Sequence, residues 1–313
     1  MLAGKRVAVV VPAFDEERLV GETVRGIPEF VDRIILVDDA SRDGTVAQVE
    51  AVGDPRVHLL RHDRNRGVGA AIATGYERAR EEGVDVTCVM AADNQMDPEE
   101  LRALAEPVAR GEVEYAKANR LFSGEAWKII PRTRYLGNAV LSLLTKIASG
   151  YWHVADSQAG YTAISHGALE RLDLGRLYPR YGFPNDLLVH LNVQDARVRD
   201  VPSRPIYDVG ERSGIRLRSV VPRISWLLLK AFWWRMGQKY VIRDFHPLVF
   251  FYVFGLLMLG VGFLLGLVEL VLRIAGNAIT PATIVLVAVL LIAGLQMTLF
   301  AMWFDMEANK ELR

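Results

Sequence analysis

Short apolar runs alternate with segments of helical periodicity in the N-terminal part of the chain. The runs over residues 6–11, 33–38, 57–61 and 86–90 are rich in valine and isoleucine, and polar residues follow each of them. Helical segments separate the runs at the spacing of β-α-β units, such as the one from Gly67 to about Glu82. The pattern predicts an α/β fold with a mostly parallel, Rossmann-like sheet and helices on both faces.

The middle of the chain predicts three further elements. They are a helix over 136–148, a strand over 159–165 and a helix over 183–195. Asp186 comes near the start of the last helix, where a carboxylate stabilises the helix dipole. Action of Asp186 as a general base is the alternative interpretation.

Two long apolar segments follow, over Leu248–Val268 and Ile284–Phe304, each of 21 residues without a charge. A helix of that length reaches about 31 Å at a rise of ~1.5 Å per residue. That is enough to cross a hydrocarbon core of ~30 Å. A buried core helix is the alternative for either segment alone, but two in succession predict a transmembrane hairpin.

The segment before this hairpin is basic and aromatic. Eight cations and no acid lie between Arg212 and Arg243, interleaved with tryptophan and leucine. We expect an interfacial helix in the headgroup region of an anionic membrane, with Pro222 at its first position. The alternative is a helix packed on its own domain or on another protomer, which leaves a homo-oligomer open.

Composition and charge indicate which partners and which cellular compartment to expect. The 37 basic and 37 acidic residues cancel, so the chain has no overall basic excess and we expect no nucleic-acid partner. The single cysteine, Cys88, excludes an intrachain disulfide and fits a reducing compartment. Residues 1–6 lead directly into the first strand without a signal-peptide pattern. We therefore expect a multi-pass protein of the cell (plasma) membrane with its catalytic domain in the cytosol.

Candidate chemistry lies directly after the fourth apolar run. Asp93 and Gln95 follow that strand, and Pro98 opens a helix just beyond them. Open α/β sheets bind ligands at this edge, and hard oxygen ligands suit Mg²⁺ or Mn²⁺ carrying a diphosphate. An ordinary polar loop is the alternative interpretation.

The usual glycine-rich nucleotide motifs are missing from the sequence. Gly67-Val68-Gly69 lacks the third glycine of the dinucleotide fingerprint, since Ile72 stands in its place, and no P-loop follows any strand. The sequence therefore predicts a nucleotide held by carboxylates and metal rather than by a glycine cradle.

Five motifs occur in an order typical of one enzyme family. They are Pro12–Glu16, Val37–Asp39, Ser41–Thr45, Asn65–Gly69 and Asp93–Gln95. Over roughly residues 5–215 the chain resembles family-2 glycosyltransferases, and more closely their dolichol-phosphate mannose synthase and polyprenyl-phosphate glycosyltransferase branch. The resemblance implies a fold of the GT-A type.

The resemblance also implies roles for individual residues. The residues that would contact the nucleotide are Pro12, Phe14, Glu16, Asp39 and Asp93. Asp93 and Gln95 would hold the metal, and Arg120 would neutralise the diphosphate. Arg134 would face the transferred phosphate groups, and Asp156 matches the catalytic aspartate of the family's acceptor-side motif.

The chain departs from the family pattern at two places. Ala91 stands where a carboxylate is usual, so Asp97 or water would have to substitute. Val209 and Gly214 stand where an arginine and a lysine are usual. Arg212 and Arg216 would then supply the charge that binds the acceptor phosphate.

The resemblance implies inverting transfer of a hexose, from GDP-mannose or UDP-glucose, to a polyprenyl or dolichyl phosphate. The acceptor phosphate is already an anion, so the reaction needs no strong general base. Two alternatives are a polysaccharide synthase, whose Q-x-x-R-W motif is missing here, and a non-catalytic nucleotide-binding module, motivated by Ala91. We expect a glycosyltransferase domain over 1–215, the interfacial segment over 216–246, the hairpin over 247–304 and a cytosolic tail over 305–313.

Overall fold

The computed structural model describes the chain except residues 123–131, 205, 207–216 and 279, and except the side chains of 132–136 and 217–219. By their contacts, the described residues form two units. One comprises Met1–Phe232 together with Glu311–Arg313, and the other comprises Trp233–Lys310. The division between Phe232 and Trp233 falls within one helix. The predicted domain boundaries were placed between segments of different function, and they stay predictions.

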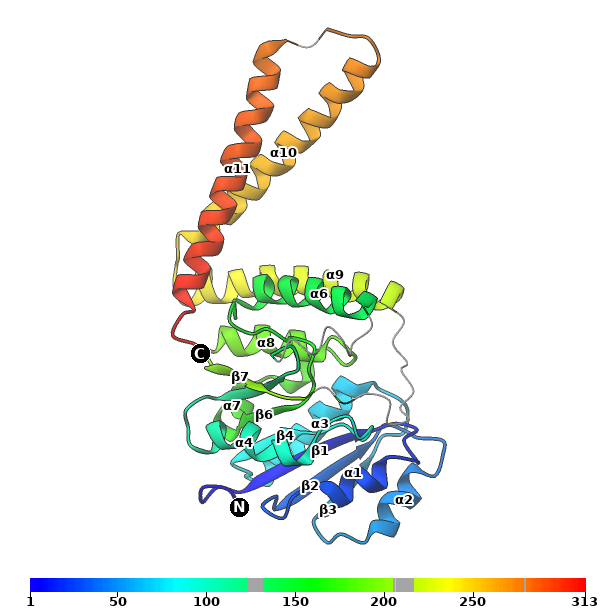
Figure 1. Ribbon diagram of the computed structural model, residues 1–313. Helices are drawn as coiled ribbons and strands as arrows, with labels where there is room; N and C mark the ends of the chain where they lie inside the picture. Colours follow the sequence, from blue (N-terminus) through cyan, green and yellow to red (C-terminus); the bar gives the residue numbers. More distant parts are fainter. Residues whose placement is uncertain (123–131, 205, 207–216, 279) are drawn as a thin grey trace. The chain divides into compact units, whose positions relative to one another are not determined.

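The first unit is built on a seven-stranded sheet with the order β3-β2-β1-β4-β6-β5-β7 (Figure 1). The strands are β1 (Val7–Ala13), β2 (Arg33–Asp38), β3 (Val57–Arg61), β4 (Val86–Val89), β5 (Tyr115–Asn119), β6 (Thr162–Ser165) and β7 (Val198–Pro202). Only β6 among them runs antiparallel to its neighbours. The carboxyl ends of the other six strands therefore meet at one edge, where β6 begins. The predicted α/β fold with a mostly parallel sheet is confirmed.

Helices cover both faces of this sheet, as predicted. Because side chains alternate along a strand, Val7, Val9 and Val11 of β1 pack into one core cluster, whereas Ala8 and Val10 pack into the other. The first cluster lies under α1 (Val20–Gly26) and α4 (Leu101–Ala109), which follows the short helix η1 (Pro98–Glu100). The second lies under α3 (Val68–Glu81), α7 (His166–Arg171) and α8 (Phe183–Val193). Among the described residues, the other helices that lie wholly within this unit are α2 (Thr45–Val52), α6 (Arg132–Ser149) and η2 (Leu174–Arg176).

Helix α9 (Leu217–Gly237) crosses the division between the units and continues as a π-helical segment, η3 (Gln238–Arg243). Pro222 lies inside α9, so the prediction that it opens the helix is wrong. The first N–H groups of a helix have no intrahelical partner, so proline is free of cost there. In the second turn it removes a single backbone hydrogen bond, and α9 tolerates that loss.

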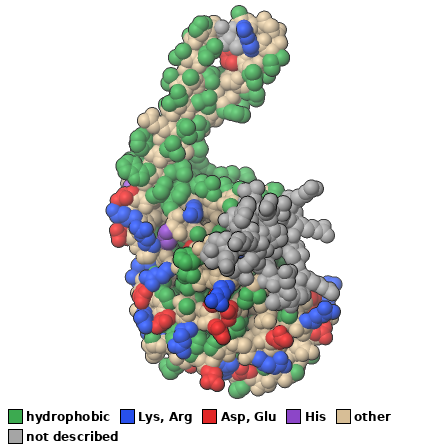
Figure 2. Space-filling view, in the orientation of Figure 1, with side chains coloured by type: hydrophobic (Ala, Val, Ile, Leu, Met, Phe, Trp, Pro, Cys, Tyr) green, Lys and Arg blue, Asp and Glu red, His purple; other side chains and the backbone are tan. Residues whose placement is uncertain are grey.

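The second unit contains α10 (Leu248–Ile274) and α11 (Pro281–Ala308), which pack as a hairpin. Both have a mean hydropathy of 2.6 over their most apolar stretch and are long enough to cross a membrane. Hydrophobic side chains cover the hairpin, whereas charged side chains gather on the first unit (Figure 2). The helices approach closely where Gly255 meets Gly294, since a Cβ added to Gly294 would lie 2.9 Å from the Gly255 oxygen. Small residues permit such close crossings of membrane helices.

Candidate functional site

Backbone strain gathers at the carboxyl edge of the sheet. Asp15, Ala40 and Asn94 follow β1, β2 and β4, and all three have left-handed backbones with φ of 55°, 63° and 57°. Such conformations cost a non-glycine residue on the order of 1–3 kcal/mol and concentrate at functional sites. Three of the five described non-glycine residues with left-handed backbones therefore lie at the edge that the sequence singled out.

The loops after β1 and β2 are joined by hydrogen bonds from the Ser41–Thr45 motif. The Asp15 N–H donates to Ser41 Oγ at 2.9 Å, and the Arg42 N–H donates back to Asp15 Oδ1 at 2.8 Å. The Glu16 N–H donates to Thr45 Oγ1 at 2.8 Å. Thr45 thus fixes the backbone of Glu16, a role that the sequence analysis missed although it noted the motif.

Carboxylates converge around Glu16. Burial, followed by the negative charges of Asp93, Asp43 and Asp15, raises the pKa of Glu16 to about 7. Glu16 after β1 and Asp93 after β4 therefore lie close enough to repel each other, as expected for neighbouring parallel strands. Phe14 exposes 41% of its surface, and its predicted contact with the nucleoside stays a prediction.

Asp39 is buried at the end of β2 and binds the loop after β3. Its Oδ1 accepts from the Arg66 N–H at 2.8 Å, and its Oδ2 accepts from the Gly67 N–H at 2.7 Å. The His62 ring lies 2.7 Å from Oδ1 through Nδ1 and 3.0 Å from Thr74 Oγ1 through Nε2. The sequence analysis missed His62, although its position directly after β3 was an available signal. Its prediction that Asp39 contacts the nucleoside stays a prediction.

The two glycines of the same loop serve packing. A Cβ on Gly67 would lie 2.5 Å from the Pro179 oxygen, and one on Gly69 would lie 2.5 Å from the Tyr178 oxygen. The Ala70 N–H donates to the Pro179 oxygen at 3.0 Å. The loop needs glycine to lie directly against this turn.

The predicted metal ligands lie together in the loop after β4. The Gln95 N–H donates to Asp93 Oδ1 at 3.2 Å, and both side chains are half-buried. Asp97 Oδ1 accepts from the Glu99 N–H at 2.9 Å and so caps η1. Within the described ranges, no three His, Cys, Asp or Glu side chains are grouped to hold a metal. Water and diphosphate oxygens would have to complete any shell around Asp93 and Gln95, which is usual for Mg²⁺.

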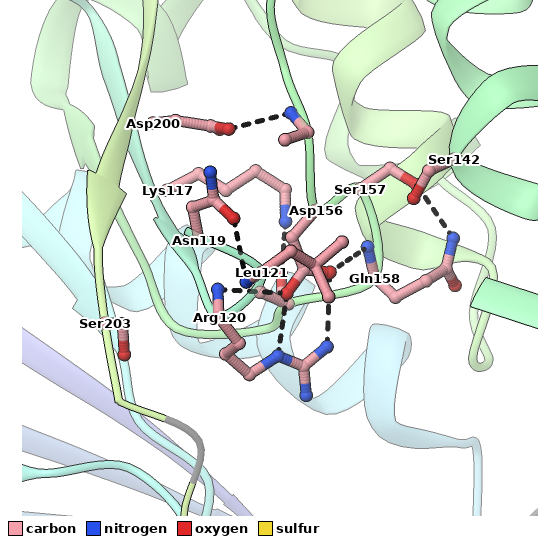
Figure 3. Close-up of polar contacts among 12 residues, drawn as sticks. Lys117, Asn119, Arg120, Leu121, Ser142, Asp156, Ser157, Gln158, Asp200 and Ser203 are labelled. Atoms are coloured by element: carbon pink, nitrogen blue, oxygen red, sulfur yellow. Dashed lines mark hydrogen bonds and ion pairs between the residues drawn. The ribbon is translucent and has the colours of Figure 1, made fainter. Parts of the chain in front are cut away.

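Arg120, at the end of β5, forms a two-point ion pair with Asp156 (Figure 3). Its Nε donates to Asp156 Oδ2 at 2.7 Å, and its terminal NH2 donates to Oδ1 at 3.2 Å. Burial opposes ionisation of this carboxyl, but the charge and hydrogen bonds of Arg120 prevail and lower the pKa of Asp156. The pair occupies two of the five guanidinium N–H groups.

Two buried charges that the sequence analysis missed lie beside this pair. Lys117 is fully buried in β5 and donates from Nζ to the Ala159 oxygen at 2.6 Å. Asp200 in β7 accepts from the Ala155 N–H at 2.7 Å. Burial lowers the pKa of Lys117 to about 8 and raises the pKa of Asp200 above its usual value. A lysine inside an otherwise apolar strand was the available signal.

Other predicted residues lie elsewhere or outside the described residues. Asp186 is buried in α8, where its Oδ2 accepts from the Tyr178 N–H at 2.9 Å. It therefore holds the turn on which Gly69 packs. Arg134 belongs to α6, but its side chain lies outside the description. Arg212 and Arg216 lie outside the described residues altogether.

The sequence and the fold have counterparts among known proteins. Residues 8–173 match the family described as Glycosyl transferase family 2. A UDP-N-acetylglucosamine–dolichyl-phosphate N-acetylglucosaminyltransferase of Methanococcus voltae is 29% identical, over 66% of this chain and 88% of that protein. An undecaprenyl-phosphate mannosyltransferase of Micrococcus luteus is 30% identical, over 63% and 82%. A polyprenol monophosphomannose synthase of Mycolicibacterium smegmatis is 28% identical, over 71% and 86%.

A solved structure shares the fold. The glucosyl-3-phosphoglycerate synthase of Mycobacterium tuberculosis, in complex with Mn²⁺ and UDP, superposes with a TM-score of 0.56 at 20% identity. The match covers 75% of this chain and 81% of that one. At that identity the likeness shows the fold alone.

Proposed function

The chain belongs to glycosyl transferase family 2 and is a glycosyltransferase, and from this we propose that it glycosylates a polyprenyl or dolichyl phosphate. The donor is a hexose carried by a nucleoside diphosphate, with GDP-mannose and UDP-glucose as the first candidates. The names of the three relatives described above contain dolichyl phosphate, undecaprenyl phosphate and polyprenol, and two of them name mannose whereas one names N-acetylglucosamine. They support the acceptor class and leave the donor to experiment.

One observation carries the proposal. A single chain joins an edge of converging carboxylates to two exposed apolar helices of membrane-spanning length. The first feature suits a metal-bound sugar nucleotide, and the second suits an acceptor whose hydrocarbon stays in the bilayer. A water-soluble acceptor would not require the two membrane-spanning helices.

The residues at the edge fit a divalent cation, either Mg²⁺ or Mn²⁺. Glu16 and Asp93 repel each other, and burial together with the charges of Asp93, Asp43 and Asp15 raises the pKa of Glu16. When bound, the cation would neutralise diphosphate charge as the sugar departs. Asp93 and Gln95 would hold it, since their oxygens are of the type that Mg²⁺ and Mn²⁺ prefer.

The remaining chemistry falls to arginine and to the acceptor itself. Arg120 stabilises the negative charge that develops on the leaving diphosphate, and Arg134 contributes further charge near the phosphates. Arg212 and Arg216, which lie outside the described residues, would bind the acceptor phosphate. A phosphate oxygen of the lipid attacks the anomeric carbon from the side opposite the diphosphate. The bond between that carbon and the diphosphate breaks, so the configuration inverts. Because that oxygen is already anionic, the reaction requires no histidine base.

We place the first unit in the cytosol, on the surface of the cell membrane that α10 and α11 span. Residues Glu311–Arg313 follow the hairpin and yet belong to the first unit. The Val198 N–H of β7 donates to the Leu312 oxygen at 3.0 Å. This bond supports a hairpin that crosses twice and returns to the side from which it started.

The experiment that tests this function offers labelled GDP-mannose, UDP-glucose and UDP-N-acetylglucosamine separately to membranes containing the protein and polyprenyl phosphate. We expect label in the lipid extract with one of them, and no label after removal of divalent metal. Membranes with the Asp93→Asn variant are the matched control. Hydrolysis of the donor without labelled lipid, or no reaction with any of the three, would contradict the proposal.

A further inference from the structure

Lys117 and Asp200 place opposite charges next to each other beneath the candidate site. They are direct register partners on the adjacent parallel strands β5 and β7, so their side chains lie on the same face of the sheet. Lys117 has no exposed surface. A buried lysine is costly because its charge leaves water, so its charge needs a compensating partner.

Asp200 and Lys117 form hydrogen bonds with the two ends of one segment, residues 155–159. Asp200 Oδ2 accepts from the Ala155 N–H at 2.7 Å, and Lys117 Nζ donates to the Ala159 oxygen at 2.6 Å. Asp156 lies between these two points and holds Arg120 through both of its oxygens. Figure 3 shows Lys117 and Arg120 beside Asp156, which belongs to this segment.

Asp156 itself is poorly suited to move protons or to touch the acceptor. Only 1% of its surface is exposed, and its Oδ1 also accepts from the Gln158 N–H at 3.2 Å. A carboxylate that is buried and bound to arginine is a support for that arginine. Its role is therefore to orient Arg120 rather than to act as a base.

We propose that Lys117 is a positioning residue of the transfer reaction, which fixes the segment 155–159 and, through Asp156, the guanidinium of Arg120. This inference rests on the proposed function, because Arg120 matters there for the charge on the leaving diphosphate. The groups whose charges act on Lys117 are Asp156, Asp200 and Arg120. Burial lowers the pKa of Lys117 to about 8, so the support weakens when the ammonium loses its proton above that pH.

The first test compares Lys117→Met with the unmodified enzyme in the lipid-transfer assay between pH 6.5 and 9.5. Methionine keeps the length of the side chain and removes its charge. We expect kcat at pH 7 to fall roughly 10- to 100-fold, with the donor KM within about 3-fold, because misplacing a catalytic group acts on the transition state. The decline of kcat above about pH 8 in the unmodified enzyme should disappear in the variant. Lys5→Met, at an exposed lysine beside Asp85, is the control and should match the unmodified enzyme.

The second test needs no enzymatic activity. Phenylglyoxal modifies arginine, and mass spectrometry of peptides gives the rate at Arg120 relative to the exposed Arg64. We expect relative modification of Arg120 to rise between pH 7 and 9 in the unmodified protein, and to be high at both pH values in Lys117→Met. The pH series on the unmodified protein tests the inference even if the variant does not fold.

The outcomes separate the two proposals. No transfer by the unmodified enzyme contradicts the proposed function, while the modification rates still test the positioning of Arg120. A folded Lys117→Met variant with normal kcat, pH profile and Arg120 protection overturns the inference. A variant that is only less stable, with those three properties unchanged, also overturns it, because the lysine would then serve stability alone.

Discussion

At the scale of single residues, the candidate site is a set of charges whose positions follow from strand ends. Glu16, Asp39 and Asp93 could be assigned to one edge from sequence because parallel strands end together. Lys117 and Asp200 could not be placed side by side from sequence, because their proximity depends on the register between β5 and β7. Such a register brings together residues far apart in the chain, and no local pattern encodes it.

Asp93→Asn tests the metal assignment. The substitution keeps the polar volume and removes the charge that would hold the cation, so we expect transfer to fall at least ~100-fold. Calorimetric binding of the nucleoside diphosphate with Mn²⁺ should weaken, and thermal unfolding should be unchanged. Asp195→Asn, at an exposed aspartate on the opposite edge of the sheet, is the control. Near-normal transfer by Asp93→Asn would show that Asp93 does not hold the metal.

The stability of a Glu16→Gln variant tests whether burial and the neighbouring carboxylates destabilise the ionised form of Glu16. The folded-state pKa of Glu16 is about 7 against an ordinary 4.5. The folded protein therefore holds this proton more tightly, and its stability declines as pH rises from about 4.5 to 7. Without nucleotide and metal, glutamine should stabilise the protein at pH 8 by on the order of 1 kcal/mol, discounted for the solvent that reaches this half-buried group. At pH 5 the two proteins should unfold alike.

Chemical denaturation at the two pH values measures this difference. Glu77→Gln, at an exposed glutamate of α3, is the control and should show no dependence of its effect on pH. An equal effect of Glu16→Gln at pH 5 and pH 8 would mean that Glu16 does not titrate near neutrality.

At the scale of elements, the strands and apolar helices were the most predictable parts. The strands over 33–38 and 57–61 have the predicted bounds, because their residues are apolar and bounded by turns. The start of α9 was mispredicted, because proline favours a first turn but does not require one. The π-helical segment η3 was not predicted. Its Lys239 and Tyr240 bond to Asn309 and Asp305, and no local pattern encodes such contacts between distant parts of the chain.

A buried ion pair joins α9 to α11 within the second unit. Arg235 and Asp305 are fully buried and bond at 2.8 and 2.9 Å, and the Tyr240 hydroxyl donates to Asp305 at 2.7 Å. Asp305→Ala would leave the arginine charge without its carboxylate, which typically costs about 3–5 kcal/mol. We expect a large fall in the midpoint of thermal unfolding in detergent. The double variant Arg235→Met, Asp305→Leu should recover much of it.

The control is Glu307→Ala, which removes an exposed partner of Lys310 on the same helix. Exposed pairs contribute about 0–1 kcal/mol, so its midpoint should hardly move. Equal effects of Asp305→Ala and Glu307→Ala would show that the buried pair contributes no more than a surface one.

At the scale of the whole molecule, the sequence predicted the order of the parts but not the bond between the last residues and β7. The sheet, the basic aromatic segment and the two apolar helices appear in the predicted order. The pairing of Leu312 with Val198 had no local signal, because a single residue after α11 supplies the bond. The predicted tail over 305–313 thus begins inside α11, and its last residues belong to the first unit.

Cysteine labelling tests the topology of the hairpin. Asn277→Cys and Lys310→Cys are expressed separately in intact cells and treated with a thiol reagent that does not cross membranes. We expect labelling at 277 alone, because in the proposed arrangement the turn between the spans faces outward and residue 310 does not. The native Cys88 is a suitable background, since it is buried and burial raises the pKa of its thiol to about 12. Labelling at 310, with or without labelling at 277, would overturn the proposed arrangement.

The bond between Val198 and Leu312 also has a consequence for biogenesis. The two residues are far apart in the sequence, and both apolar helices lie between them, so this contact forms late in folding. Until then the Val198 N–H of the edge strand β7 lacks this partner, and an edge strand is a ready template for pairing with another chain. Slow insertion of the hairpin would therefore expose newly made protein to aggregation through β7, even when the catalytic sheet has already folded.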